Sequence, residues 1–112
     1  MSFDAFSVVV VPFPFTDRAT SKRRPALVLS DKKQFNQPIG HSVLAMITSA
    51  KQSAWPLDQV INNLDAAGLP SPSLVRMKLF TLDDRLILRQ IGELSDDDKT
   101  LVGKQIKQLF YL

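Results

Sequence analysis

The feature that most constrains the fold is an apolar run near the N-terminus, Val8 to Phe15 (VVVVPFPF). Its consecutive valines favour a strand buried on both faces, because β-branched side chains pack well on a pleated surface and leave no polar face for solvent. Pro12 and Pro14 cannot donate hydrogen bonds to a neighbouring strand, so the second half of the run must be an edge, a bulge or an exit from the sheet.

Further short apolar segments follow between polar loops. Ser73–Leu79 alternates apolar and basic residues as a half-buried strand does, with Arg76 and Lys78 facing away from the core. Such spacing, in a chain of 112 residues, predicts one domain built on a small barrel or a strongly bent antiparallel sheet. The other predicted strands are Ala26–Ser30, Val43–Ser49, Leu57–Ile61 and Arg85–Ile91, and the predicted loops are Thr16–Arg24, Asp31–Ser42 and Asn62–Pro72, the last with one helical turn at Leu64–Ala67.

A terminal helix is predicted after Ser95, which is a good N-cap. Asp96, Asp97 and Asp98 then occupy the first turn, where the helix dipole favours negative charge, and apolar residues follow at helical spacing. The three aspartates resemble a metal site, but adjacent helical side chains splay apart around the axis. Capping therefore explains them better than metal binding.

Composition excludes several kinds of site. The chain has no cysteine and one histidine, which rules out disulfides, cysteine-based zinc sites and multi-histidine metal sites. It has no glycine-rich phosphate loop. No segment approaches the ~18 apolar residues of a membrane span, and no basic segment leads into a small-residue cleavage site. We therefore expect a cytoplasmic protein without a membrane segment, a metal or another cofactor.

Positive charge is concentrated in one part of the chain. Between Asp17 and Lys33 there are six cations and two anions, a local excess of +4 against a net charge of +3 for the whole chain. Such a patch suits a polyanion, mainly nucleic acid, although a solvated loop rich in lysine has the same composition.

Arg24 stands directly before Pro25 and the predicted strand Ala26–Ser30. A residue before proline is held in an extended conformation, so this guanidinium has a fixed mount. Its planar set of donors suits a phosphate, whereas Lys22 and Arg23, further from the strand, should be freer. Alternatively, Arg24 pairs with an acid such as Asp83 or Glu93 and only closes the barrel.

Other candidate residues surround the third predicted strand. Thr48 and Ser49 end it and Lys51 follows; their hydroxyl groups could bind a phosphate or a base, or cap a turn through local hydrogen bonds. His41 could act as a general base at neutral pH, or be a surface residue. Trp55 could stack on a base, or cover the rim of the core.

Two segments, VVVVPFPFTD and SKRRPALVLS, resemble the opening of the PemK/MazF family of toxin endoribonucleases. The resemblance continues through AMITS (Ala45–Ser49) and AGLPSPSLVRMKLFTLDDRLI (Ala67–Ile87), and ends with the helix after Gly92. It implies a single domain over residues 1–112 with a mainly β (α+β) fold. The implied architecture is a small SH3-like barrel of five to seven short strands with a C-terminal helix, acting as a homodimer.

The resemblance also implies a function. Members are metal-independent, often sequence-specific endoribonucleases that cleave single-stranded RNA and are held inactive by a cognate antitoxin, with DNA binding as a toxin–antitoxin complex. Arg24 and Thr48 match the family's catalytic pair. Lys22, Arg23, Ser49 and Lys51 are the residues expected to bind RNA.

RNA carries its own nucleophile in the 2′-hydroxyl group, so an enzyme without a metal need only align it and stabilise the phosphorane. The expected products are a 2′,3′-cyclic phosphate and a 5′-hydroxyl, with Arg24 and Thr48 at the phosphate. Two alternatives stay open: a non-catalytic nucleic-acid-binding SH3-like barrel, and an interaction module whose groove receives only an antitoxin peptide.

Overall fold

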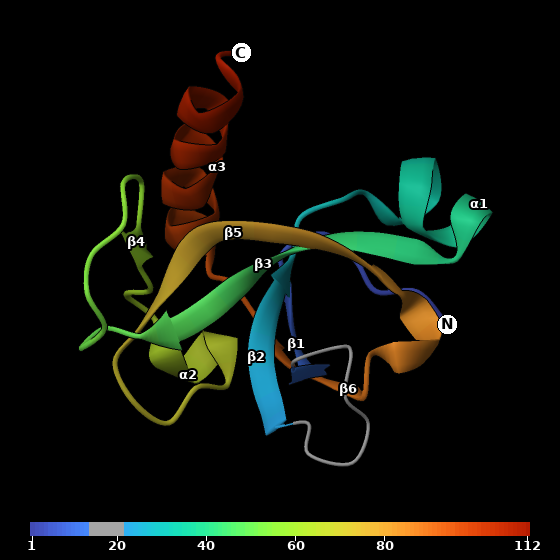
Figure 1. Ribbon diagram of the computed structural model, residues 1–112, viewed down its shortest axis with the longest axis horizontal. Helices are drawn as coiled ribbons and strands as arrows, with labels where there is room; N and C mark the ends of the chain where they lie inside the picture. Colours follow the sequence, from blue (N-terminus) through green and yellow to red (C-terminus); the bar gives the residue numbers. More distant parts are fainter. Residues whose placement is uncertain (14–21) are drawn as a thin grey trace.

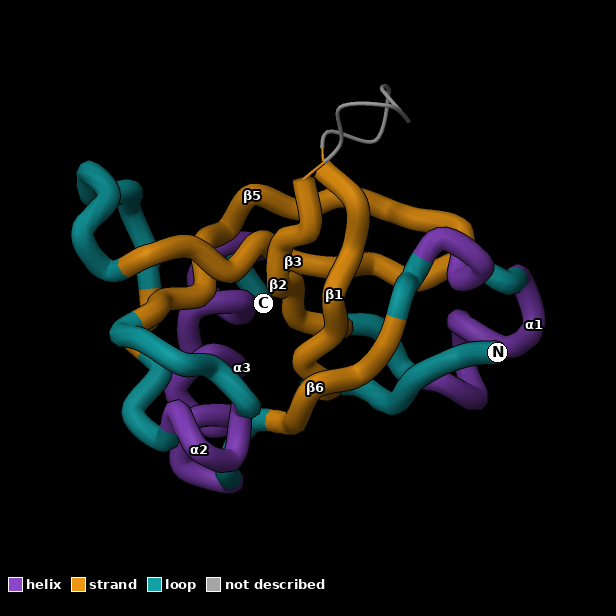
Figure 2. The backbone as a smooth tube through the Cα atoms, turned by 90° about the horizontal axis from the view of Figure 1, so that it is seen from below, coloured by secondary structure: helices purple, strands orange, loops and turns teal. Residues whose placement is uncertain are grey.

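The computed structural model describes residues 1–13 and 22–112. These residues form a six-stranded antiparallel sheet in the order β4-β5-β3-β2-β1-β6, curled into a half-barrel (Figures 1 and 2). This confirms the predicted mainly β fold with a C-terminal helix. The strands are β1 Ser7–Phe13, β2 Lys22–Val28, β3 His41–Ser49, β4 Gln59–Val60, β5 Ser73–Asp83 and β6 Arg89–Glu93, and the helices are α1 Gln37–Ile39, α2 Leu64–Ala67 and α3 Asp96–Phe110.

The valine run forms β1, between β2 and β6. Val8 packs into one core cluster, whereas Val9 and Val11 pack into a second cluster on the other face. The prediction of a strand buried on both faces is therefore confirmed. Pro12 remains within the strand, and Pro14 and Phe15 lie outside the described residues.

Two hydrophobic cores cover the two faces of the sheet. The helix-side core lies against α2 and α3 and contains Val8, Leu27, Ala45, Ile47, Ile61, Ala67, Leu69, Val75, Leu94 and Val102. The opposite core contains Val9, Val11, Ala26, Val28, Leu44, Leu82 and Ile87, with Phe3 and Phe80 packed against it. Neighbouring residues on β1, β2 and β3 alternate between the two cores because successive strand side chains point to opposite faces.

A bulge interrupts the pairing of β5 with β3. Ala45 pairs with Leu79 but the next residue of β3, Met46, pairs with Arg76, so β5 carries two extra residues at this point. A bulge of this kind increases local bending and twist, and Figure 1 shows β5 arching across β3. Strand β5 is therefore longer than the predicted Ser73–Leu79 and continues to Asp83.

Several predicted boundaries were wrong. The predicted loop Thr16–Arg24 ends earlier, because Lys22–Arg24 pair with β1 as the start of β2; residues 16–21 lie outside the described residues. The predicted loop Asp31–Ser42 instead contains a π-helical turn and α1, and its last two residues begin β3. The Asn36 amide stabilises this segment by donating to the carbonyls of Phe3 and Ser30, at 3.0 Å each.

Two other predicted strands are shorter or shifted. Leu57–Ile61 is reduced to the two residues of β4. In Arg85–Ile91, a 3-10 turn over Asp84–Leu86 comes first, and the strand begins only at Arg89. Hydrogen bonds from the backbone and side chain of Arg85 to Asp83 favour the turn over a strand start.

The terminal helix begins as predicted. The Ser95 hydroxyl accepts from the Asp98 N–H at 3.3 Å, which is a side-chain N-cap. The buried Asp98 carboxylate accepts from the backbone N–H groups of Asn62 and Asn63, so it also fixes the segment before α2. In Figure 1 the far end of α3 extends beyond the sheet. None of the described helices has the length and apolar character needed to cross a membrane.

Candidate functional site

A gap opens in the sheet where β2 and β3 stop pairing. The two strands are paired at Val28–Leu44, Leu27–Ala45 and Ala26–Met46. Beyond that point, residues Lys22–Pro25 pair with β1 and residues Met46–Ser49 pair with β5. The two strand ends therefore follow different neighbours and separate from each other.

A cavity of about 250 Å³ lies at this separation. Arg24 is two residues from Ala26, and Thr48 is two residues from Met46, so both point to the face of the last β2–β3 pair. Ala26 on this face belongs to the opposite core. The cavity therefore lies on the same face of the sheet as that core, and its lining includes polar and charged side chains. The lining residues are Phe13, Arg24, Met46, Ile47, Thr48, Gln52, Trp55, Arg76 and Lys78.

The fold thus brings together the two residues predicted to be catalytic. Arg24 is exposed on β2, and its backbone pairs with the fully buried Val11, which fixes where the side chain starts. Thr48 is half-buried on β3 and pairs with Leu74 of β5. An arginine and a hydroxyl group from adjacent strands therefore face one cavity.

Neither acid named as an alternative partner for Arg24 is paired with it in the structure. Asp83 is bound by Arg85 at 2.7 Å, and hydrogen bonds from that guanidinium hold the pKa of Asp83 well below its usual range. Glu93 pairs with Lys99 at 3.5 Å. Among residues 1–13 and 22–112, no ion pair joins Arg24 to an acid.

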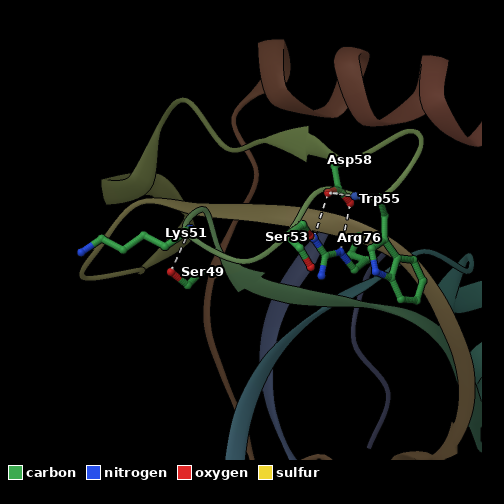
Figure 3. A network of polar contacts seen from close by, with 6 residues as sticks. All are labelled: Ser49, Lys51, Ser53, Trp55, Asp58 and Arg76. Atoms are coloured by element: carbon green, nitrogen blue, oxygen red, sulfur yellow. Dashed lines mark hydrogen bonds and ion pairs between the residues drawn. The ribbon is translucent and has the colours of Figure 1, made fainter.

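The four residues expected to bind RNA do not line the cavity. Lys22 and Arg23 are exposed at the start of β2, beside Arg24. The Ser49 hydroxyl accepts from the Lys51 N–H at 3.2 Å, so Ser49 makes the local turn contact that was the alternative for this segment. Figure 3 shows the Lys51 side chain extending away from the Trp55 and Arg76 side chains.

His41 lies at the opposite end of β3 from Thr48. Seven residues separate them, a span of about 23 Å along a strand. Its Nδ1 atom is 3.1 Å from the carbonyl oxygen of Ile39, and its neighbour across the sheet is Asp83. His41 therefore cannot be the general base for a phosphate between Arg24 and Thr48.

Sequence reasoning missed an ion pair in the cavity wall (Figure 3). The Arg76 guanidinium donates from Nε and Nη2 to the two carboxylate oxygens of Asp58, at 3.1 and 2.9 Å, and Nη2 also donates to the Ser53 carbonyl at 2.6 Å. The backbone N–H of Trp55 donates to the same carboxylate at 2.8 Å. The guanidinium carbon lies 5.0 Å from the centre of the Trp55 ring, within cation–π range.

The ion pair is largely withdrawn from solvent, since the two side chains are 10% and 12% exposed. The hydrogen bond from Arg76 lowers the pKa of Asp58, helped by the Trp55 N–H and opposed by desolvation. The same hydrogen bond raises the pKa of Arg76. The alternation in Ser73–Leu79 correctly placed Arg76 on the face away from the helix-side core, but nothing in the sequence pairs it with Asp58.

The cavity is electropositive. Its described lining contains Arg24, Arg76 and Lys78 and no carboxylate, while Asp58 neutralises Arg76 from behind. The Lys78 ammonium lies 5.3 Å from the centre of the Phe13 ring. In the described part of the chain, no cluster of three or more histidine, aspartate or glutamate side chains could hold a metal ion. The cavity therefore suits an anion with an adjoining apolar or aromatic group.

Comparisons with known proteins show the family and the fold of this chain. Residues 4–110 match the model of the family described as PemK-like, MazF-like toxins of type II toxin–antitoxin systems. No curated protein sequence matches the chain significantly. Among solved structures, a chain of the MazE–MazF crystal structure (form III) from Deinococcus radiodurans is 24% identical, with a TM-score of 0.79 over 100% of this chain and 99% of that chain.

Two further solved structures have the same fold. The Mycobacterium tuberculosis toxin MazF-mt6 is 21% identical, with a TM-score of 0.73 over 95% of this chain and 97% of its own. A mycobacterial endoribonuclease in complex with its cognate antitoxin is 14% identical, with a TM-score of 0.76 over 98% and 94%. With the family match covering nearly the whole sequence, this chain belongs to the PemK-like, MazF-like toxins of type II toxin–antitoxin systems.

Proposed function

We propose that this toxin is a metal-independent endoribonuclease that cleaves single-stranded RNA at the cavity between β2 and β3. The observation that carries the proposal is the convergence of Arg24 and Thr48 on one electropositive cavity without a lining carboxylate among the described residues. The family match and the likeness to a solved endoribonuclease support the same reaction class.

The reaction uses groups that this site, the substrate and water supply. The 2′-oxygen attacks the adjacent phosphorus and gives its proton to solvent water, the bond to the 5′-oxygen breaks, and that oxygen takes up a proton from water. The products are a 2′,3′-cyclic phosphate and a 5′-hydroxyl. Arg24 stabilises the negative charge that grows on the phosphate oxygens, and the Thr48 hydroxyl donates a hydrogen bond to hold the phosphate in line.

RNA on either side of the scissile phosphate is bound by exposed cations. Lys22 and Arg23 extend β2 beyond Arg24, and Ser49 and Lys51 follow Thr48 on the other side of the gap. Such phosphate contacts position a strand without reading its sequence, and they weaken as salt concentration rises. The preferred sequence is set by the groups that contact bases.

We also propose the biological setting of a type II system: one domain over residues 1–112, a cytoplasmic homodimer, and a cognate antitoxin that blocks the RNA site and binds DNA as a complex with the toxin. The similarity to chains from a MazE–MazF complex and from an endoribonuclease–antitoxin complex supports the antitoxin partner.

The test is to incubate a long RNA with the purified protein in EDTA and to map every new 5′ end. Recurrent breaks at a short sequence, with 5′-hydroxyl and 2′,3′-cyclic phosphate ends, are the expected result. RNA that is bound in a salt-sensitive way but stays intact would establish the non-catalytic alternative. RNA that is neither bound nor cut, by a protein that still captures its antitoxin, would leave only the interaction module.

A further inference from the structure

The cavity that Arg24 and Thr48 line is also lined by an exposed aromatic ring. Trp55 is 42% exposed although it lines a cavity, and it lies on the loop between β3 and β4. Trp55 belongs to neither hydrophobic core in the described part of the chain.

One guanidinium fixes this loop at several points. Arg76 binds the Asp58 carboxylate and the Ser53 carbonyl, and the carboxylate in turn accepts from the Trp55 N–H (Figure 3). Because the Arg76 guanidinium lies 5.0 Å from the ring centre, it covers one face of the indole. The loop is therefore held by Arg76, and a ligand that stacks on Trp55 has only the other face of the indole available.

The loop also contains a strained turn. The Asp58 N–H donates to the Trp55 carbonyl at 3.3 Å, with Pro56 and Leu57 between them, and Leu57 has a φ of 65°. Proline followed by a residue with positive φ is the pattern of a type II turn, whose third position favours glycine or asparagine. A leucine there persists only when the surroundings hold it, and such strain gathers at binding sites. The Arg76–Asp58 ion pair supplies that restraint.

We propose that Trp55 is the stacking platform for a nucleobase next to the scissile phosphate, and that Arg76 and Asp58 are the positioning residues that hold it there. This rests on the proposed function, because the phosphate bound at Arg24 and Thr48 places the base. Every base has a flat face, so stacking on an indole is a general way to bind single-stranded nucleic acid. A cation behind the ring favours a nucleotide over an uncharged aromatic ligand, as do the charges of Arg24 and Lys78, which form no ion pair with an acid among residues 1–13 and 22–112.

Binding can be observed directly because Trp55 is the only tryptophan in the chain. The probe is a 5′-labelled oligodeoxynucleotide, which lacks the 2′-hydroxyl and stays intact, and its matched control is an abasic oligonucleotide of the same length and charge. We expect both to bind by polarisation at low salt and only the base-containing one to quench Trp55 emission. Equal quenching by both, no quenching at saturation, or no binding of either would overturn the proposal.

The variants separate stacking from packing. Trp55→Leu should weaken oligonucleotide binding about 10- to 100-fold, whereas Trp55→Phe keeps an aromatic face and should recover most of it. Phe35 has the same exposed fraction, 42%, on the distant π-helical turn, so Phe35→Leu is the matched control and should change nothing. If Trp55→Leu binds like the wild type, or Trp55→Phe is as weak as Trp55→Leu, the ring does not stack on a base.

The positioning role predicts a particular kinetic pattern. Asp58→Asn should raise KM for RNA severalfold with little change in kcat, since it loosens the ring without touching the phosphate. A severalfold fall in kcat with KM unchanged would show that Asp58 supports the chemical step instead. Cleavage with no response of Trp55 would overturn only this inference, and quenching without cleavage would overturn only the nuclease proposal. If the antitoxin quenches Trp55 emission and the oligonucleotide does not, Trp55 binds a peptide and not a base.

Discussion

Arg24 and Arg76 line the same cavity but differ in what holds them. Arg76 donates to both carboxylate oxygens of Asp58 and to a backbone carbonyl, and its side chain is 10% exposed. Arg24 is exposed at the start of β2, and no ion pair restrains it within the described residues. A guanidinium already bound to a carboxylate contributes little net charge, whereas an exposed one on a fixed strand can bind a phosphate.

The difference arises from the neighbours of each arginine in the sheet. Arg24 pairs with Val11, whose side chain offers no acceptor, and Pro25 follows it. Arg76 pairs with Met46, and the loop before β4 then folds back to place Asp58 against it. The two residues are equivalent in chemistry, but of the two the fold supplies an acid, among residues 1–13 and 22–112, to Arg76 alone.

The largest effect is expected for Arg24→Ala. Removal of one preorganised donor to a reacting phosphate should lower kcat by about 10²- to 10³-fold, because the charge of the phosphorane is left without its partner. Single-turnover cleavage of a defined RNA in EDTA measures this, and a melting curve like that of the wild type shows that folding is intact. Arg85→Ala removes a guanidinium far from the cavity and is the control. If the Arg24 variant turns over RNA as fast as the wild type, Arg24 does not stabilise the reacting phosphate.

Thr48→Ala should have the next largest effect. A hydrogen bond to a charged group contributes about 1.5–3 kcal/mol, which corresponds to roughly 10- to 100-fold in kcat/KM. Thr48→Ser keeps the hydroxyl group and should recover most of the rate. If alanine and serine behave alike on a defined RNA, the hydroxyl group does not contact the phosphate and Thr48 only shapes the end of β3.

Acid should disrupt the side of the cavity that Arg76 holds. The hydrogen bond from Arg76 keeps the pKa of Asp58 below its ordinary value of 3.8. A carboxylate with a lowered pKa stabilises the fold above its ordinary pKa and loses that contribution as the pH falls through the folded value. The loop should therefore be intact at neutral pH and loosen below pH ~4. Trp55 emission against pH should show this step, and Asp58→Asn should lack it. A step that persists in Asp58→Asn would assign it to another acid.

The smallest effects are expected for Lys22→Gln and Arg23→Gln. Each removes one phosphate contact outside the cavity, so binding should weaken and the slope of log K against log salt concentration should fall by about 0.7 for single-stranded RNA. The rate at saturating RNA should stay close to that of the wild type. A large fall in kcat for either variant would mean that the reacting phosphate lies further out along β2 than Arg24.

Much of the fold followed from local pattern. The valine run, the alternation in Ser73–Leu79 and the Ser95 cap all identified elements that the structure contains. The errors lie where side-chain contacts outside the hydrophobic pattern decide the backbone. Asn36, for example, organises a predicted loop through the carbonyl of Phe3, which is far away in the sequence. A local contact decides another, because the hydrogen bond from the Arg85 backbone to Asp83 turns a predicted strand start into a 3-10 turn.

The sequence by itself determined the buried valine strand, the start of the terminal helix and the extended backbone at Arg24, because valine branching, capping and proline geometry act over a few residues. Only the tertiary structure decided what those parts do together. The point at which β2 and β3 separate joins Arg24 to Thr48, leaves His41 at the far end of β3, and places a guanidinium held by Asp58 behind Trp55. These positions depend on the register between strands and on the loop before β4 that folds back onto β5. Both are determined by contacts between residues far apart in the sequence.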